Sequence, residues 1–136
     1  MKSLMTVLFF MVVMQSALSR AADTSICNPS ASMSTFEDGQ VKSCDLASLY
    51  EVGSVKCSAY TLITFYQGGT LASCVMYEGI AVNGVPCGGQ GTISFYPSGA
   101  LNSCTLNKDF TIEGRKCITA QPISLYENGK LQSCSE

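Results

Sequence analysis

The fold of this chain is decided by a short stretch that reads FYPSGALNSCTL from Phe95 to Leu106. Alternating apolar and small polar residues before and after the turn favour two strands, and Pro97-Ser98-Gly99 supplies the turn between them. The pattern recurs at an offset of thirty residues without an insertion, as YQGGTLASC from Tyr66 and YENGKLQSC from Tyr126. A fixed period of this length indicates a repeat protein.

Columns of one residue type run through all four copies of the pattern. Cysteines fill two columns, one of Cys27, Cys57, Cys87 and Cys117 and one of Cys44, Cys74, Cys104 and Cys134. Others contain Phe36, Tyr66, Tyr96 and Tyr126, then Gly39, Gly69, Gly99 and Gly129, then Ser43, Ser73, Ser103 and Ser133. The predicted units lie at about 27–56, 57–86, 87–116 and 117–136, within a single repeat domain over 22–136.

Each unit has the local pattern of a β-hairpin. Residues 93–96 alternate as a half-buried strand does, and the Asn128-Gly129 pair favours a two-residue hairpin loop with positive φ at both positions. A second strand from Leu101 to Leu106 changes parity, so either a bulge lies near Ser103 or both faces are covered there. A third short strand follows at 110–112.

One such unit cannot bury enough apolar surface to offset its chain entropy, but a stack of units can. Columns such as Ile63, Ile93 and Ile123 would then form continuous ladders through the core. We therefore predict an all-β fold, a solenoid of four stacked β-hairpin units of thirty residues, stapled by disulfides.

The cysteine columns restrict the disulfide pairing. Pairing within each unit, as Cys27 with Cys44, uses all eight cysteines, whereas pairing across unit boundaries, as Cys44 with Cys57, strands Cys27 and Cys134. Spacing alone also allows column-wise pairing, such as Cys27 with Cys57. We favour the intra-unit set. A thiolate metal site is the weaker alternative, because zinc sites usually bring their cysteines in close Cys-x-x-Cys pairs and none occurs here.

The first residues are typical of an export signal. Lys2 precedes an uncharged segment with an apolar run from Val7 to Met14, and small residues allow cleavage between Ser19 and Ala22. We assign residues 1–21 to a signal peptide. A retained anchor is the alternative, but this apolar run is shorter than the ~20 residues that span a bilayer, and no later segment is apolar enough for a stable span. The protein is therefore expected to be secreted or periplasmic, where its cysteines oxidise.

The segments Tyr66-Gln67-Gly68-Gly69-Thr70-Leu71, Tyr96 to Leu101 and Tyr126 to Leu131 carry a resemblance to a known family. They are similar to the core of MORN-variant repeats, which read Tyr-x-x-Gly-x-Leu and stack β-hairpins into an elongated sheet. The thirty-residue period and the cysteine columns depart from that family. The resemblance implies an open β solenoid that acts as a scaffold or binding surface, and it supplies no catalytic residues.

Composition argues against several classes of function. Eight Lys and Arg residues against ten Asp and Glu give a net charge of −2, which leaves no basic surface for nucleic acid. The chain has no histidine, the commonest general base, and this leaves the serine column without its usual activating partner. We therefore interpret that column as structural. Carboxylates could supply acid and base groups, but no acidic column persists through the units.

These observations favour a non-enzymatic protein without a cofactor, a scaffold or binding module at the cell envelope or outside the cell. The tyrosines Tyr66, Tyr96 and Tyr126 are the candidate binding surface, because aromatic rings at regular spacing suit a glycan or an extended peptide. Their alternative role is to cover a sheet face. The partner is thus an unidentified protein or glycan. A small secreted inhibitor or toxin-like disulfide protein is the alternative function.

Overall fold

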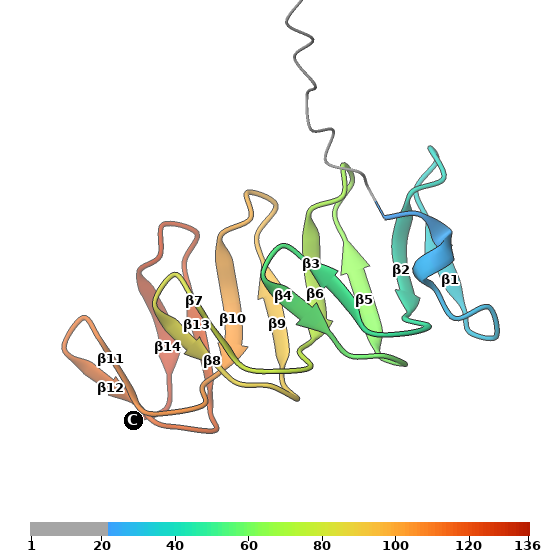
Figure 1. Ribbon diagram of the computed structural model, residues 1–136. Helices are drawn as coiled ribbons and strands as arrows, with labels where there is room; N and C mark the ends of the chain where they lie inside the picture. Colours follow the sequence, from blue (N-terminus) through green and yellow to red (C-terminus); the bar gives the residue numbers. More distant parts are fainter. Residues whose placement is uncertain (1–21) are drawn as a thin grey trace, which may run out of the picture.

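The computed structural model describes residues 22–136, which form two layers of β-structure (Figure 1). One layer is an antiparallel sheet of eight strands in the order β1-β2-β5-β6-β9-β10-β13-β14, and the other consists of the two-stranded hairpins β3-β4, β7-β8 and β11-β12. The expected signal peptide over residues 1–21 lies outside the described residues. None of the described residues belongs to a helix long and apolar enough to cross a membrane.

The sheet strands come in pairs, one pair per unit. They are β1 (Met33–Thr35), β2 (Val41–Asp45), β5 (Leu62–Phe65), β6 (Leu71–Val75), β9 (Thr92–Phe95), β10 (Leu101–Thr105), β13 (Pro122–Leu125) and β14 (Leu131–Cys134). The hairpin strands are β3 (Tyr50–Val52), β4 (Val55–Cys57), β7 (Ile80–Val82), β8 (Val85–Cys87), β11 (Phe110–Ile112) and β12 (Arg115–Cys117). A single turn of 3₁₀ helix, η1 (Thr24–Ile26), precedes β1.

Register repeats across every boundary between units. Cys44 pairs with Ile63, Cys74 with Ile93 and Cys104 with Ile123. Inside each sheet hairpin the register shifts once, as between Leu101 and Ser103, where Asn102 is the extra residue. This bulge is the one expected near Ser103. It resets the alternation so that both Leu101 and Cys104 face the core.

The turn chemistry differs from the expectation at one point. Around Asn128 the chain forms a three-residue loop, in which the Tyr126 N–H donates to the Lys130 carbonyl and only Gly129 has positive φ. A two-residue loop with positive φ at both positions does occur, but at Asn83-Gly84, between β7 and β8. Gly129 explains the difference. With its positive φ it adds a third residue to the loop, and a type I turn followed by such a residue closes the hairpin.

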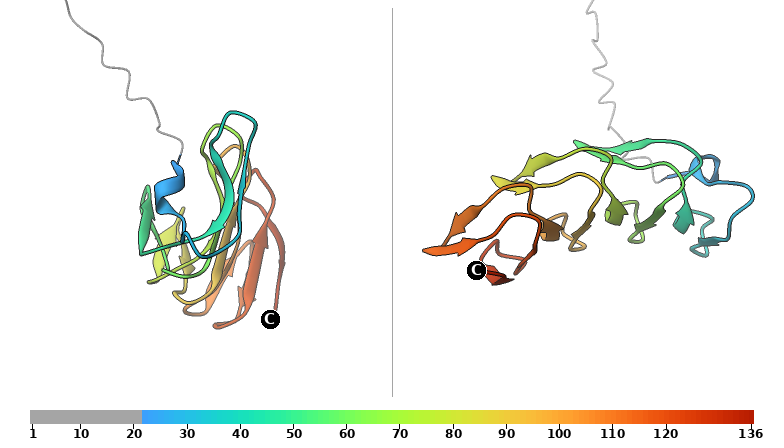
Figure 2. Two further views of the ribbon diagram at one scale, coloured as in Figure 1. Left: turned by 90° about the vertical axis from the view of Figure 1, so that its right-hand side faces the viewer. Right: turned by 90° about the horizontal axis from the view of Figure 1, so that it is seen from below.

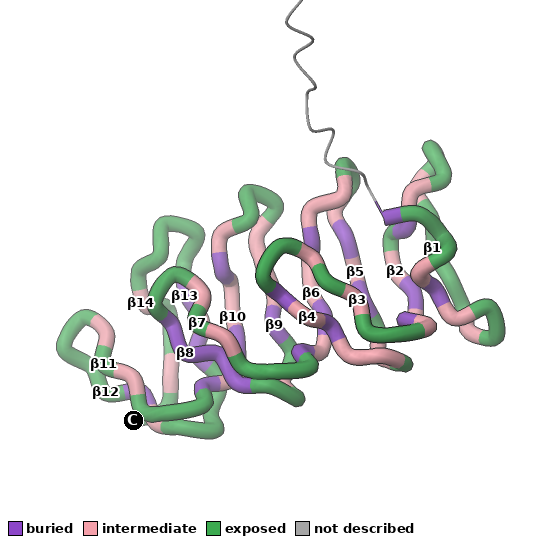
Figure 3. The backbone as a smooth tube through the Cα atoms, in the orientation of Figure 1, coloured by how far each residue is buried: buried purple, intermediate pink, exposed green. Residues whose placement is uncertain are grey.

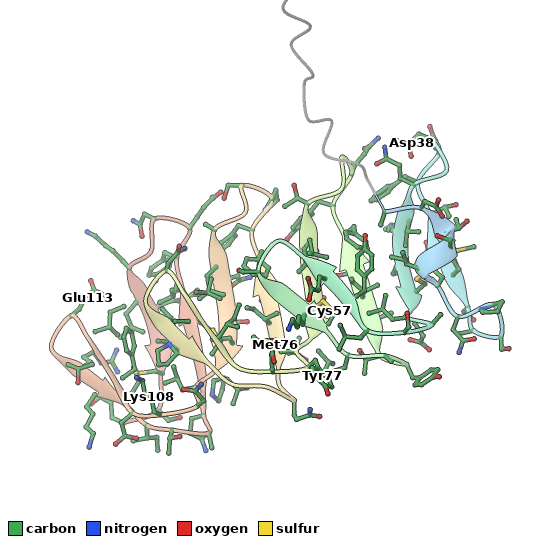
Figure 4. All side chains as sticks on the ribbon, in the orientation of Figure 1. Asp38, Cys57, Met76, Tyr77, Lys108 and Glu113 are labelled. Carbon is green, nitrogen blue, oxygen red and sulfur yellow. A yellow bond between two sulfur atoms is a disulfide. The ribbon has the colours of Figure 1, made fainter. Side chains whose placement is uncertain are left out.

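The core lies between the two layers (Figure 3). Ile63, Ile93 and Ile123 from the sheet are fully buried, and Val55 and Val85 from the hairpins pack into the same cluster. Three of the disulfides join a hairpin strand to a sheet strand, and in the first one Cys27 follows η1 instead. Figure 4 shows Cys57 between the layers. The four bonds are Cys27–Cys44, Cys57–Cys74, Cys87–Cys104 and Cys117–Cys134, with Cα–Cα distances of 5.5–5.8 Å.

The intra-unit pairing of all eight cysteines is therefore confirmed, and so is the all-β, disulfide-stapled character of the fold. The solenoid of four stacked units stays a prediction. The sheet hairpins lie side by side in one open sheet, and the shorter hairpins line one of its faces (Figure 2). The sequence also missed β4, β8 and β12, because each is only three residues long and β12 begins with the charged Arg115 and Lys116.

Candidate functional site

We call the face of the eight-stranded sheet that points away from the hairpins the outer face. Alternation along each strand assigns its residues: in β5, Ile63 and Phe65 are buried against the hairpins, and Thr64 between them points outward and is half-buried. In β6 the inward residues are Leu71 and Cys74, and Ser73 points outward. The outer face therefore takes alternate residues of each strand, except at the bulges, where two successive residues such as Ala72 and Ser73 lie outside the core.

An unbroken row of hydroxyls crosses the outer face, with one residue from every strand of the sheet. In strand order, the paired residues are Ser34, Ser43, Thr64, Ser73, Ser94, Ser103, Ser124 and Ser133. Neighbouring strands lie about 4.8 Å apart, so the row repeats a hydroxyl at that spacing. We call this row the hydroxyl ladder.

The hydroxyls of the ladder pair inside the sheet hairpins. Thr64 Oγ1 lies 2.7 Å from Ser73 Oγ, and Ser94 Oγ lies 2.7 Å from Ser103 Oγ. One hydrogen of each pair makes this bond, which leaves a second hydrogen and further acceptor lone pairs for a ligand or water. These short contacts fix the hydroxyl positions of the two central pairs before any partner binds.

The sheet that carries the ladder is almost uncharged. Among its eight strands only β2 contains charged residues, Lys42 and Asp45. The ionic contacts lie in the hairpin layer and around it, where the Lys56 ammonium is 2.8 Å from Glu78 and the Lys116 ammonium is 3.0 Å from Asp109. The outer face is thus polar, and Lys42 and Asp45 are the only charged residues in its strands.

The charged groups of the hairpin layer hold hairpins in place. The Thr119 N–H donates to Asp109 Oδ1 at 2.9 Å, and this bond, with Lys116, holds the pKa of the Asp109 carboxyl below its ordinary value. The hydrogen bond and charge of Glu78 raise the pKa of Lys56, with a smaller effect from Glu51. Both carboxylates bridge to that one lysine, which is a structural arrangement.

Tyrosines flank the hydroxyl ladder near the turn end of the strands. The Tyr66 hydroxyl donates to the Phe95 carbonyl and the Tyr96 hydroxyl donates to the Leu125 carbonyl, both at 2.8 Å. Each ring thereby reaches from its own unit to the next. Tyr126, the last of the column, has 51% of its surface exposed. Two of the three predicted binding tyrosines thus have a structural bond, and the rings still border the ladder.

The opposite side of the sheet has two equivalent grooves between the hairpin tips and the sheet turns. Their volumes are about 390 and 250 Å³. Val55, Leu71 and Phe95 line the larger groove, and the residues thirty positions later, Val85, Leu101 and Leu125, line the smaller one. These grooves are mostly apolar and shallow, and they follow from the packing of the two layers.

No free thiol is present among residues 22–136, so the cysteines there cannot supply the thiolates of a metal site. Sequence reasoning found the serine column of the second strand of each unit and interpreted it as structural, and the bonds of Ser73 and Ser103 to the neighbouring strand agree with that role. It missed the first-strand column, Ser34, Thr64, Ser94 and Ser124. The available signal was a hydroxyl residue two positions before each aromatic one. Only the register shows that the two columns form one row.

No family model, curated protein or solved structure matches this chain.

Proposed function

We propose that this protein is a secreted or periplasmic, non-enzymatic binding module that presents a repeated surface to a partner at the cell envelope or outside the cell. Four disulfides are typical of proteins in an oxidising compartment, and a chain built this way keeps its fold there. We also propose that the units are true repeats. Their Tyr-x-x-Gly-x-Leu segments relate them to MORN-variant repeats.

The observation that carries this proposal is the hydroxyl ladder. Core packing explains the inward residues of the sheet, but it does not require a hydroxyl at the same outward position of every strand. Valine or isoleucine would suit a strand equally well, or better. A surface that repeats one chemical group at one spacing favours a partner that is itself extended and repetitive.

Binding to envelope material tests the proposal. We expect the mature protein, residues 22–136 with its disulfides intact, to sediment saturably with envelopes or extracellular matrix from cells that produce it. A variant with Thr64→Val and Ser73→Ala removes one hydroxyl pair from the outer face and should bind less. Thr111→Val removes a hydroxyl from the exposed strand β11 in the hairpin layer and is the matched control.

A protein that remains in the supernatant at every concentration contradicts the proposal. An equal loss of binding in the outer-face variant and in Thr111→Val would also contradict it, because the partner would then not distinguish the two layers.

A further inference from the structure

We infer that the outer face binds an extended, neutral polysaccharide whose chain crosses the strands along the hydroxyl ladder. This inference rests on the proposed function and names its substrate class. The first argument is charge. A polyanion would need Lys or Arg on this surface, but Lys42 is the only one in the eight sheet strands. A neutral polyol matches a face that is polar and nearly uncharged.

The second argument is hydrogen bonding. Sugar hydroxyls both donate and accept, and serine and threonine hydroxyls do the same. In the pairs Thr64–Ser73 and Ser94–Ser103 the internal bond at 2.7 Å leaves each pair with one free donor and with free acceptors. An ordered row of such pairs can therefore exchange hydrogen bonds with successive sugars without unpairing a buried group.

The third argument is the presence of apolar groups beside the ladder. On the connection side, each pair of outward residues joins an apolar residue to a polar one: Leu62 with Asp45, Val75 with Thr92 and Pro122 with Thr105. The rings of Tyr66 and Tyr96 lie on the turn side. Sugar rings have C–H faces as well as hydroxyl edges, so a row of hydroxyls with apolar groups beside it matches both parts of their surface.

An extended peptide would be the competing partner, but it would bind elsewhere. Peptides that join a sheet form hydrogen bonds with the backbone groups of an edge strand, and side chains on the face of the sheet do not take part in those bonds. The repeated feature here lies on the face.

The test uses the mature, disulfide-bonded chain, a pair of polymers that share one backbone and differ in charge, and two further neutral polymers. Affinity electrophoresis is run in gels with hydroxyethylcellulose, a neutral β-glucan, with carboxymethylcellulose, its anionic counterpart, and with a neutral xyloglucan and a galactomannan. We expect retardation by at least one neutral polymer, insensitive to salt. The combined variant Thr64→Val, Ser73→Ala, Ser94→Ala and Ser103→Ala should bind about tenfold more weakly.

Thr111→Val is again the control and should bind as the parent does. Thermal unfolding of each variant, with the disulfides confirmed by free-thiol assay, separates lost binding from lost folding. Should the four-site variant fail to fold, the pair Thr64→Val and Ser73→Ala alone is measured, with a proportionally smaller loss expected.

Three results would overturn the inference: no retardation by any neutral polymer, retardation by carboxymethylcellulose alone with strong salt dependence, or equal binding by parent and ladder variant. Saturable binding to envelopes together with any of these would leave the proposed function standing and refute the polysaccharide alone.

Discussion

The phenol hydroxyls of Tyr66 and Tyr96 show how one residue column joins the units. Each donates to a backbone carbonyl twenty-nine positions later, at 2.8 Å, from a half-buried ring. The bond does not depend on the identity of the accepting residue, because Phe95 and Leu125 both accept through their backbone. The same tyrosine bond can therefore form in successive units although the side chain of the accepting residue differs.

Replacing Tyr96 by phenylalanine should lower the free energy of unfolding by about 1 kcal/mol, since it removes one hydrogen bond and leaves the Leu125 carbonyl without that donor. Urea unfolding monitored by circular dichroism measures the change. Tyr126→Phe is the matched control: this ring is 51% exposed, and its replacement should change stability by only a few tenths of that value. Equal losses in both variants would argue against the bond.

The glycines of the segment Gly88 to Gly91 have a packing role that the amino-acid composition of the segment does not indicate. The segment reads as a flexible connector, yet a Cβ built on Gly89 would lie 3.0 Å from the Glu78 Cα. The backbone at Gly89 lies too close to the backbone of Glu78 and Gly79, between β6 and β7, to leave room for a side chain. Such an approach joins residues that are distant in sequence, and no local pattern predicts it.

Gly89→Ala should therefore destabilise the protein by about 1–3 kcal/mol, as overpacking against a backbone does. Gly88→Ala meets its nearest atom, a side-chain carbon of Asn107, at 3.3 Å and should cost less. Chemical denaturation of both variants gives the comparison. A Gly89→Ala protein as stable as the parent would show that this corner adjusts freely.

At the scale of the elements, the sequence predicted the sheet hairpins well and the shorter hairpins poorly. Strict apolar alternation marks residues 93–96, and the change of parity at Ser103 correctly suggested a bulge. The strands β4, β8 and β12 are three residues each, and their central residues differ between units: Lys56 in β4, the buried Pro86 in β8 and Lys116 in β12. Their periodicity is too short to be detected without the partner strand.

The hairpin β11-β12 is held to the following corner by the Asp109 carboxylate, and acid should release it. A carboxyl whose pKa in the folded state is lowered stabilises that state at pH values above its unfolded pKa, and the contribution is lost as the pH falls through the folded value. The ordinary pKa of this carboxyl is 3.8, so its stabilising contribution is lost at pH values below 3.8.

We expect hydrogen exchange of the Thr119 amide to accelerate below about pH 4, beyond the intrinsic pH effect. Asp109→Asn should exchange faster than the parent at neutral pH and should lack this acid-dependent step. Protection of the Thr119 amide that is independent of pH in both proteins would contradict the role given to the carboxylate.

For the whole molecule, the thirty-residue period predicted the number of units and the disulfide partners, but not the form of the assembly. Whether the chain coils into closed turns or opens into one sheet depends on where the third short strand pairs. Here β11 pairs with β12, and β3 with β4, so each forms its own hairpin over the sheet. The repeat pattern is compatible with either outcome, because both bury the isoleucine column.

Removing a single disulfide should weaken the whole molecule. Replacing Cys87 and Cys104 together by alanine opens a loop with a sequence separation of 17, for which chain entropy gives a cost of about 3 kcal/mol. Denaturant titration under oxidising conditions measures it. Because Cys87 and Cys104 are both almost fully buried, the lost packing adds to this cost. An unfolding midpoint equal to that of the parent would show that the Cys87–Cys104 disulfide stabilises neither the folded nor the unfolded state relative to the other.

Because every disulfide closes within its own unit, the gene can change length without disturbing the chemistry of the cysteines. An in-frame gain or loss of thirty codons leaves each remaining cysteine with its partner and each new boundary with the same register, Cys44 with Ile63 or Cys104 with Ile123. Oxidative folding would need no new pairing rule. Copy number is therefore a trait that recombination between repeats can vary, and the length of the outer face would vary with it.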